Sequence, residues 1–289
     1  MRRMINYMAG LMVLAGAVLL IYYQNDLAFS ESTNDRLREI KRAEETTLYT
    51  TDTSAFEVFE PTEPTSEPTS EPTSEPTLPV ESTQDDTDIF AQLRKELPTP
   101  ATNSLYDLFL ENDDFVGWIT IPDTRIDYPI VKSSDNDHYL KHDFYGQPSK
   151  AGSIFMDYRN IGDWSDPHTI IYGHKIKNKT MFYDLLRFRD PEFYQDNRIL
   201  VMETLRGPIY YKVFAAYTTG PDFYFINTRF DEVSHARFIR EIRGRTDFDW
   251  DTDVGFSSKI LTLATCSHDF EDSRYVVHAV RIDDTPDMS

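Results

Sequence analysis

The chain has 289 residues, with 49 Asp and Glu against 29 Lys and Arg, so its formal net charge is −20. That balance argues against a nucleic-acid-binding protein, because phosphate recognition needs a surface of Lys and Arg side chains. There is one cysteine, Cys266, which excludes an intramolecular disulfide and a zinc site built from several cysteines. From composition alone, that thiol is either a packed core residue or a nucleophile.

The N-terminal segment predicts a membrane anchor. An apolar run from about Tyr7 to Tyr23 contains no charged residue, and its length of about 17 residues is at the short end of what spans a bilayer. Arg2 and Arg3 precede the run, and positive charge before a span favours a cytoplasmic start. A cleaved signal peptide is the alternative, but no cleavage site is evident before Gln24. We therefore expect the first 25 residues to anchor a single-pass protein in the cell membrane, with the rest of the chain extracellular.

Residues 26–88 predict an extracellular disordered linker that builds no core. Residues 36–45 are charged and predict at most a short helix, and a Glu-Pro-Thr-Ser repeat then runs from Glu60 to Thr77. Recurrent proline removes amide donors and prevents helix formation. The tract should be extended, at about 3.1 Å per residue or roughly 50 Å in all, and should hold a folded domain away from the membrane.

The folded domain is expected at residues 89–289, and most of its signals are those of β-strands. Two helices are predicted first, one at 89–97 and one that starts after Ser104 as its cap. Eight short β-branched or aromatic runs follow between Pro, Asp and Gly breaks, at 116–121, 125–131, 153–157, 168–172, 198–204, 209–218, 259–265 and 274–282.

A long insertion at residues 219–258 separates the sixth run from the seventh. It carries an amphipathic helix, in which Val233, Ala236, Ile239 and Ile242 recur every third residue. We predict a mainly β fold, a closed eight-stranded barrel with N-terminal helices and a helix in the long crossover before the strand that bears the cysteine.

Three residues carry side chains suited to catalysis. Cys266 ends an apolar strand and is followed by polar residues, a position from which a thiol can be presented at a barrel rim. His174 also follows an apolar run, with Gly173 before it permitting a turn. Arg274 opens the final strand and returns beside Cys266 if the last two strands are antiparallel. Each residue has an ordinary structural alternative: a packed cysteine, a surface or core histidine, and a solvated charge at a strand end.

Together these residues resemble the sortase transpeptidases. The stretch Thr262-Leu-Ala-Thr-Cys266, followed by Arg274 and preceded by Tyr172-Gly-His174, is similar to the TLxTC strand of sortases with its downstream Arg and upstream His. The chain also resembles the class B branch of this family. The similar parts are the helix in the insertion and two blocks, Asp135-Asn136-Asp-His-Tyr139-Leu140 and Gly152-Ser-Ile-Phe155-Met-Asp157-Tyr-Arg159-Asn160. The resemblance covers residues 105–282 and implies a sortase-type barrel on a membrane-anchored enzyme of Gram-positive-type bacteria.

The resemblance also implies a cysteine transpeptidase mechanism. Cys266 would attack a peptide carbonyl as the thiolate, His174 would move the proton, and Arg274 would stabilise the oxyanion. The implied donor is a C-terminal sorting signal of NPxTx type on surface proteins, and the implied acceptor is an amine of a peptidoglycan precursor or cross-bridge. Neither a metal nor an organic cofactor is expected. The positions similar to those that contact substrate in class B sortases are Asn136, Leu140, Phe225 and Ile226, for which core packing is the alternative.

Three other functions stay open from the sequence. A sortase that polymerises pilus subunits would share the chemistry and differ in the amine acceptor. A hydrolytic cysteine protease would use the same Cys and His without an amine. A non-catalytic surface adhesin would fit the anchor, linker and barrel, with Cys266 as a packed thiol. Where some class B sortases carry an acidic residue two positions after the nucleophile, this chain has His268 and then Asp269, so no supporting acid is assigned.

Overall fold

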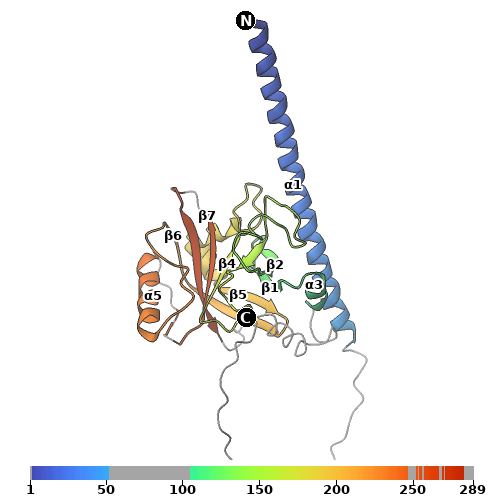
Figure 1. The fold of residues 1–289 in the computed structure, drawn as a ribbon. Coiled ribbons are helices and arrows are strands. Elements are labelled where there is room, and N and C mark those ends of the chain that lie inside the picture. The colour runs from blue at the N-terminus through green and yellow to red at the C-terminus, as the bar shows by residue number, and fades with distance from the viewer. Residues whose placement is uncertain are drawn as a thin grey trace, which may run out of the picture.

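A closed β-barrel forms the centre of the molecule, as the sequence predicts (Figure 1). The computed structural model describes residues 2–51, 105–246, 252, 254–255, 257–266, 269 and 271–282. The strands are β1 (Phe115–Thr120), β2 (Asp127–Val131), β3 (Ile154–Met156), β4 (His168–Tyr172), β5 (Ile199–Thr204), β6 (Gly207–Thr219), β7 (Ile260–Cys266) and β8 (Arg274–Ile282). The helices in the described part of the chain are α1 (Arg2–Thr51), α3 (Tyr106–Glu111), the 3₁₀ helix η3 (Phe182–Arg189), α4 (Pro191–Asp196) and α5 (Glu232–Arg245).

Around the barrel the strands follow the order β1-β2-β3-β4-β7-β8-β6-β5, and β5 closes the sheet against β1. Neighbouring strands are antiparallel except for two pairs, β2 with β3 and β4 with β7, which are parallel. Parallel neighbours end at the same edge of a sheet. The residues that follow β4 and those that end β7 therefore come out at one rim of the barrel.

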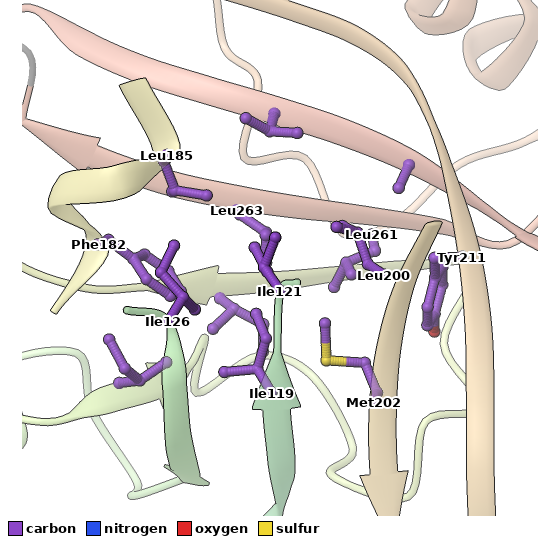
Figure 2. Close-up of a cluster of buried hydrophobic side chains, with 14 of the residues drawn as sticks. Ile119, Ile121, Ile126, Phe182, Leu185, Leu200, Met202, Tyr211, Leu261 and Leu263 are labelled. Carbon is purple, nitrogen blue, oxygen red and sulfur yellow. The ribbon is translucent and has the colours of Figure 1, made fainter. Parts of the chain in front are cut away.

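The barrel interior is filled by apolar side chains from most of the strands (Figure 2). Ile119 of β1, Met202 of β5, and Leu261 and Leu263 of β7 are all fully buried there. Successive side chains of a strand point to opposite faces, so Leu261 and Leu263 share the inward face of β7. Phe182 of η3 joins the same cluster, and Figure 2 shows η3 lying over these side chains.

A second apolar cluster covers the outer face of β7. Phe238, Ile239 and Ile242 of α5 are buried against Ile260 and Ala264, which lie on the face of β7 opposite Leu261 and Leu263. The predicted amphipathic helix is thus present, and it packs onto the barrel from the outside. Because β7 is covered on both sides, it is an apolar run rather than an alternating one.

Helix α1 differs from the prediction that the chain builds no core after residue 26. It continues without a break to Thr51, and its described side chains bury one face at Ser30, Thr33, Leu37 and Lys41. A spacing of three or four residues keeps these positions on one side of a helix. Leu37 is fully buried in a cluster with Leu105 and Leu108 of the α3 region, which tethers α1 to the barrel.

Polar contacts also dock α1 on the barrel. Arg38 donates its Nε–H to the carbonyl oxygen of Asp127 at 2.9 Å, and Lys41 pairs with the carboxylate of Glu203. Residues 26–51 are therefore helical, and those at 30–41 are part of the folded unit. The rest of the predicted linker, including its Glu-Pro-Thr-Ser repeat, and the predicted helix at 89–97 lie outside the described residues.

This docking bears on the role expected for the repeat tract. The tract lies between α1 and α3 in the chain, and both of these helices pack in the same cluster. The attachment of α1 to the barrel therefore precedes the tract in the chain. The spacer role expected for the tract itself stays a prediction.

Smaller differences concern element boundaries. All eight predicted strands are present, and β4 and β8 have the predicted bounds. Helix α3 has Leu105 rather than Ser104 at its N-cap and receives no side-chain hydrogen bond there. Neither η3 nor α4, which connect β4 to β5, was predicted from the sequence. Pro191 at the start of α4 follows Asp190, whose side chain accepts the Glu192 N–H as an N-cap.

Candidate active site

The predicted nucleophile, Cys266, is the last residue of β7 and is half-buried and unbonded to any other cysteine. It lies on the same face of the strand as Ile260 and Ala264, the face that α5 and the β6–β7 segment cover. The six preceding residues of β7 are buried, so the strand emerges from the core only at the cysteine. The fold therefore presents the thiol at the rim.

His174 reaches the same rim through the parallel pairing of β4 with β7. Tyr172 pairs with Ala264, and the Gly173 N–H donates to the Ala264 carbonyl oxygen at 3.2 Å. Two residues further along each strand, this register brings His174 alongside Cys266. The two residues were predicted from separate segments, and the sheet brings them together.

Gly173 permits this approach because there is no space for a side chain. A Cβ atom at this position would lie 2.5 Å from Cδ1 of Ile154 and 2.7 Å from Cγ of Phe182, both in the core. The backbone of His174 is fixed next to it, since its carbonyl oxygen accepts the Phe182 N–H at 2.8 Å. The histidine is thus held by the core directly beneath it.

The imidazole of His174 is oriented by one hydrogen bond. Its Nε2 lies 2.9 Å from the carbonyl oxygen of Leu140. A carbonyl oxygen can only accept, so Nε2 carries the proton in this arrangement and Nδ1 is the nitrogen that can take up another. Leu140, a predicted substrate-binding residue, therefore also fixes the tautomer of the predicted base.

Arg274 is the first residue of β8 and lies directly opposite Cys266 in the antiparallel β7–β8 pair. Side chains of directly opposed residues share one face of a sheet, with Cβ atoms about 4.5–5.5 Å apart. Arg274 is half-buried, and its Nη1 donates to the carbonyl oxygen of Ser273 at 3.2 Å. The register thus brings together all three predicted catalytic residues.

The predicted substrate-binding residues lie on both sides of this rim. Asn136 and Leu140 belong to the segment after β2, and Leu140 lines a pocket of about 340 Å³ together with His174. Phe225 packs at the edge of the outer cluster that contains Ala264 and Tyr172. Ile226 is half-buried next to it, and no contact to His174, Cys266 or Arg274 is described for it.

Helix α1 also lines the pocket beside His174. Tyr22 and Asp26 line it from the helix, and Asp26 accepts the Lys150 backbone N–H at 3.0 Å. The ammonium of Lys150 lies 4.6 Å from the ring centroid of Tyr22. Nothing in the sequence indicated that residues next to the apolar run would lie so near the predicted base.

His278 belongs to a buried chain of hydrogen bonds. The chain joins Tyr217, His278, Thr262, His168 and the carbonyl oxygen of Asn227, with distances of 2.9, 2.7, 2.6 and 2.6 Å. The carbonyl end fixes its direction, because that oxygen can only accept, from Nδ1 of His168. Thr262 then donates to Nε2 of His168, Nδ1 of His278 donates to Thr262, and Tyr217 donates to Nε2 of His278. Every group in the chain is satisfied with both histidines neutral.

The pKa values of the two histidines agree with their being neutral. Burial lowers the pKa of His168 to about 4 and lowers the pKa of His278 well below its ordinary value. Thr262, the first residue of the TLxTC-like stretch, bridges the two rings. The threonine is therefore accounted for by packing beneath the insertion rather than by contact with the reacting atoms.

A buried carboxylate, Asp157, is the main site feature that was not singled out from the sequence. It follows β3, is fully buried, and forms an ion pair with Arg159 at 2.7 Å. Its Oδ2 also accepts from the Tyr172 hydroxyl at 2.9 Å and from Nδ2 of Asn136 at 3.1 Å. In the sequence, Asp157 lies within the Gly152–Asn160 block, whose resemblance to class B sortases implies no role for its individual members.

Comparison with known proteins agrees with this architecture. A model of the sortase domain family matches residues 119–282, which is more than half of the chain. Sortase B of Listeria monocytogenes is 39% identical over 178 residues, covering 61% of this chain and 72% of that protein. Sortase B of Staphylococcus aureus is 30% identical over 194 residues, covering 67% and 78% respectively.

Solved structures give the same result. A Bacillus anthracis protein described as similar to sortase B is 34% identical, with a TM-score of 0.59 over 71% of this chain and 100% of that one. A Staphylococcus aureus sortase B–substrate complex is 30% identical, with a TM-score of 0.60 over 68% and 91%. The chain belongs to the sortase family of cysteine transpeptidases. Within that family it is a class B sortase.

Proposed function

We propose that this sortase cleaves an NPxTx-type sorting signal at the C-terminus of surface proteins and transfers the protein to an amine of peptidoglycan. The observation that carries the proposal is the register of β7 between β4 and β8, which sets Cys266 opposite Arg274 and alongside His174. The similarity to the Staphylococcus aureus sortase B–substrate complex supports a peptide substrate at this rim.

In the first half of the reaction, Cys266 acts as the nucleophile. His174 takes the thiol proton on Nδ1, and the thiolate attacks the carbonyl carbon of the scissile peptide bond. The tetrahedral oxyanion accepts hydrogen bonds from the guanidinium of Arg274, which is charged at all relevant pH values. The C–N bond then breaks, His174 returns its proton to the departing amine, and a thioester to Cys266 remains.

In the second half, an amine replaces the departed peptide. It attacks the thioester carbonyl and loses a proton to His174, and the C–S bond breaks to release the Cys266 thiolate. The product is a new amide bond, so peptide-bond energy is conserved and no external energy source is needed. Transfer to water instead of an amine would make the enzyme a protease, and transfer to a pilin amine would make it a polymerase.

The proposed setting is the outer face of the cell membrane. Within the described part of the chain, α1 is long and apolar enough to cross a membrane, and the apolar side chains from Met12 to Tyr22 are exposed. Arg2 and Arg3 favour a cytoplasmic N-terminus. Tyr22 and Asp26 lie at the end of the apolar run and line the pocket beside His174, which supports an active site close to the membrane surface.

The test is turnover of a peptide with an Asn-Pro-X-Thr motif by the full-length protein in detergent, with and without an added amine. We expect cleavage, a ligated product when the amine is present, and neither product nor thioester with Cys266→Ala. Cleavage by the alanine variant at a near-normal rate would disprove the mechanism. Hydrolysis with no ligation at any amine concentration would favour the protease, and failure of a small alkylating agent to modify Cys266 in the folded protein would favour the adhesin.

A further inference from the structure

Asp157 is the most completely paired buried charge in the described part of the barrel. Its Oδ1 accepts from the backbone N–H and Nε–H of Arg159 at 3.0 and 2.8 Å, and its Oδ2 accepts from Nη2 of the same guanidinium at 2.7 Å. Two side-chain contacts on one carboxylate make a bidentate pair, which fixes geometry as well as charge. Burial acts to raise the pKa of Asp157, but the hydrogen bonds from Arg159 and Tyr172 and the Arg159 charge together outweigh it, so the pKa lies below its usual value.

The remaining contacts of Asp157 reach one wall of the predicted substrate groove. Oδ2 accepts from Nδ2 of Asn136, and the Asn136 Oδ1 in turn accepts the Tyr158 N–H at 3.0 Å. Both ends of the Asn136 amide are therefore held, so its orientation is fixed. Four residues further on, the carbonyl oxygen of Leu140 holds Nε2 of His174. The wall that carries Asn136 is thus tied to the predicted base at one end and to Asp157 at the other.

Asp157 is also tied to β4, the strand that leads to His174. The Tyr172 hydroxyl donates to Oδ2 at 2.9 Å, and Tyr172 is followed directly by Gly173 and His174. Burial, together with the neighbouring Asp157 charge, raises the pKa of Tyr172. This hydroxyl therefore stays protonated and continues to donate across the pH range in which the enzyme works.

Arg159 extends the connection to the segment between β6 and α5. Its Nη1 donates to the hydroxyl oxygen of Tyr224 at 2.9 Å. Tyr224 is 60% exposed and lies in the segment between β6 and α5, next to the predicted substrate residue Phe225. One guanidinium therefore bonds a buried carboxylate on the barrel side and an exposed tyrosine on the insertion side.

We propose that Asp157 and Arg159 are a positioning pair that holds the segments of Asn136 and Tyr224, which both carry predicted substrate-binding residues, in a fixed relative position, with Tyr224 as the contact on the insertion. This inference rests on the proposed function, since it assigns the pair to the binding of the peptide donor. Neither residue touches the reacting atoms. The pair sets how well the peptide is bound, and the reactivity of the thiol is independent of it.

Tyr224→Phe and Arg159→Lys test this proposal with the full-length protein in detergent and a fluorogenic peptide that carries an Asn-Pro-X-Thr motif. Phenylalanine keeps the ring and removes only the hydrogen bond to Arg159. Lysine keeps the charge and loses the planar fork that contacts both partners. We expect KM to rise about three- to tenfold for Tyr224→Phe and about tenfold or more for Arg159→Lys, with kcat changed by less than about twofold.

The rate at which iodoacetamide alkylates Cys266 separates positioning from a general structural defect. It should be the same in both variants and the parent, because the small reagent does not use the groove. Tyr158→Phe is the matched control: Tyr158 is a neighbouring exposed tyrosine, its backbone N–H is untouched by the change, and its hydroxyl makes no hydrogen bond to the residues that the structure describes. Its KM should equal that of the parent.

Unchanged KM in both Tyr224→Phe and Arg159→Lys would overturn the positioning role while leaving the transpeptidase function intact. A parallel fall in kcat, alkylation rate and melting temperature would also overturn it, since that pattern indicates damage to the fold. Absence of peptide turnover by the unsubstituted protein would instead remove the proposed function, and the positioning role with it.

Discussion

Arg274 and Arg281 form a matched pair of residues, because they lie on the same strand at different distances from the thiol. Arg274 is opposite Cys266 in the β7–β8 pair, whereas Arg281 is opposite Tyr211 in the β8–β6 pair. Seven residues of strand separate them by about 23 Å. Only Arg274 can therefore reach an oxyanion formed at Cys266.

Substitution of the two arginines tests this difference. Losing one oxyanion donor typically costs about 100- to 1000-fold in rate. We expect at least that loss of peptide turnover for Arg274→Ala, little recovery for Arg274→Lys because an ammonium lacks the planar fork, and an effect of no more than a few-fold for Arg281→Ala. Equal losses at the two positions, or a near-active Arg274→Ala, would remove Arg274 from the catalytic set.

Gly173 is a second residue whose substitution has a defined outcome. An added Cβ would lie within 3 Å of Ile154 and Phe182, so Gly173→Ala forces the core or the His174 backbone to shift. Overpacking of this kind costs about 1–3 kcal/mol. We expect a lower free energy of unfolding in denaturant titration and a loss of turnover larger than the loss of folded protein. Gly255→Ala is the control, because a Cβ there meets no atom of the described residues within 4 Å, and it should behave as the parent.

At the scale of secondary-structure elements, the chain of hydrogen bonds from Tyr217 to His168 joins four neighbouring strands of the barrel, β6, β8, β7 and β4, beneath the segment that carries α5. Burial lowers the pKa of both histidines in the folded protein, and the unfolded chain binds protons near the usual pKa of about 6.5. Between those values the unfolded state binds more protons than the folded state. The contribution of the two neutral histidines to the free energy of unfolding is therefore complete above about pH 6.5, and it is lost as the pH falls below that value.

Equilibrium unfolding between pH 7 and pH 5 measures this effect. Each histidine contributes a fall of at most about 1.4 kcal/mol per pH unit, and carboxylates with ordinary pKa values titrate below this window. We expect His278→Gln to reduce the pH dependence relative to the parent, whatever its effect on stability at pH 7. A flat stability curve for the parent from pH 7 to pH 5 would contradict the neutral, buried assignment of the two rings.

The sequence patterns predicted those helices and strands that are determined by residues close together in the chain. The β4 and β8 bounds follow from short apolar runs between breaking residues, and Ile239 and Ile242 identify the buried face of α5. The α1 extension was not predicted, because Leu37 is the one fully buried apolar residue on its described face, and the docking otherwise depends on contacts with distant residues. Arg38, for example, bonds to Asp127, which is 89 positions away.

The residues of the candidate site also separate into those with a local signal in the sequence and those without one. His174, Cys266 and Arg274 were predicted because each ends or begins a recognisable strand within a known motif. Asp157 was not, because an acidic residue after a strand normally indicates a turn. Its role depends on Asn136 and Tyr172, which the barrel brings to it from other segments.

At the scale of the whole molecule, the docked part of α1 makes the N-terminal helix part of the folded unit. A chain beginning at Ile89 would leave Leu105, Leu108 and Trp118 without the cover of Leu37, and would remove the contacts of Arg38 with Asp127 and of Lys41 with Glu203. Burial of one leucine side chain contributes about 1.5–3 kcal/mol.

Comparison of two shortened chains tests this contribution. The chain that begins at Asp26 should be more stable than the chain that begins at Ile89 by about 2 kcal/mol or more, which corresponds to roughly 4–8 °C in Tm for a protein of this size. Thermal unfolding of both chains measures the difference. Equal melting temperatures would show that the barrel does not depend on α1, as expected from the sequence alone.

The attachment of α1 ahead of the repeat tract also governs how freely the number of Glu-Pro-Thr-Ser units can vary. A tract between two docked helices closes a loop, and each doubling of loop length costs only about 0.6 kcal/mol. With α1 as the proposed membrane anchor, the height of the barrel above the bilayer would be set by the roughly 14 residues of helix from Tyr23 to Leu37, or about 21 Å. Under that proposal, a gain or loss of repeat units would leave the distance of the enzyme from the membrane unchanged.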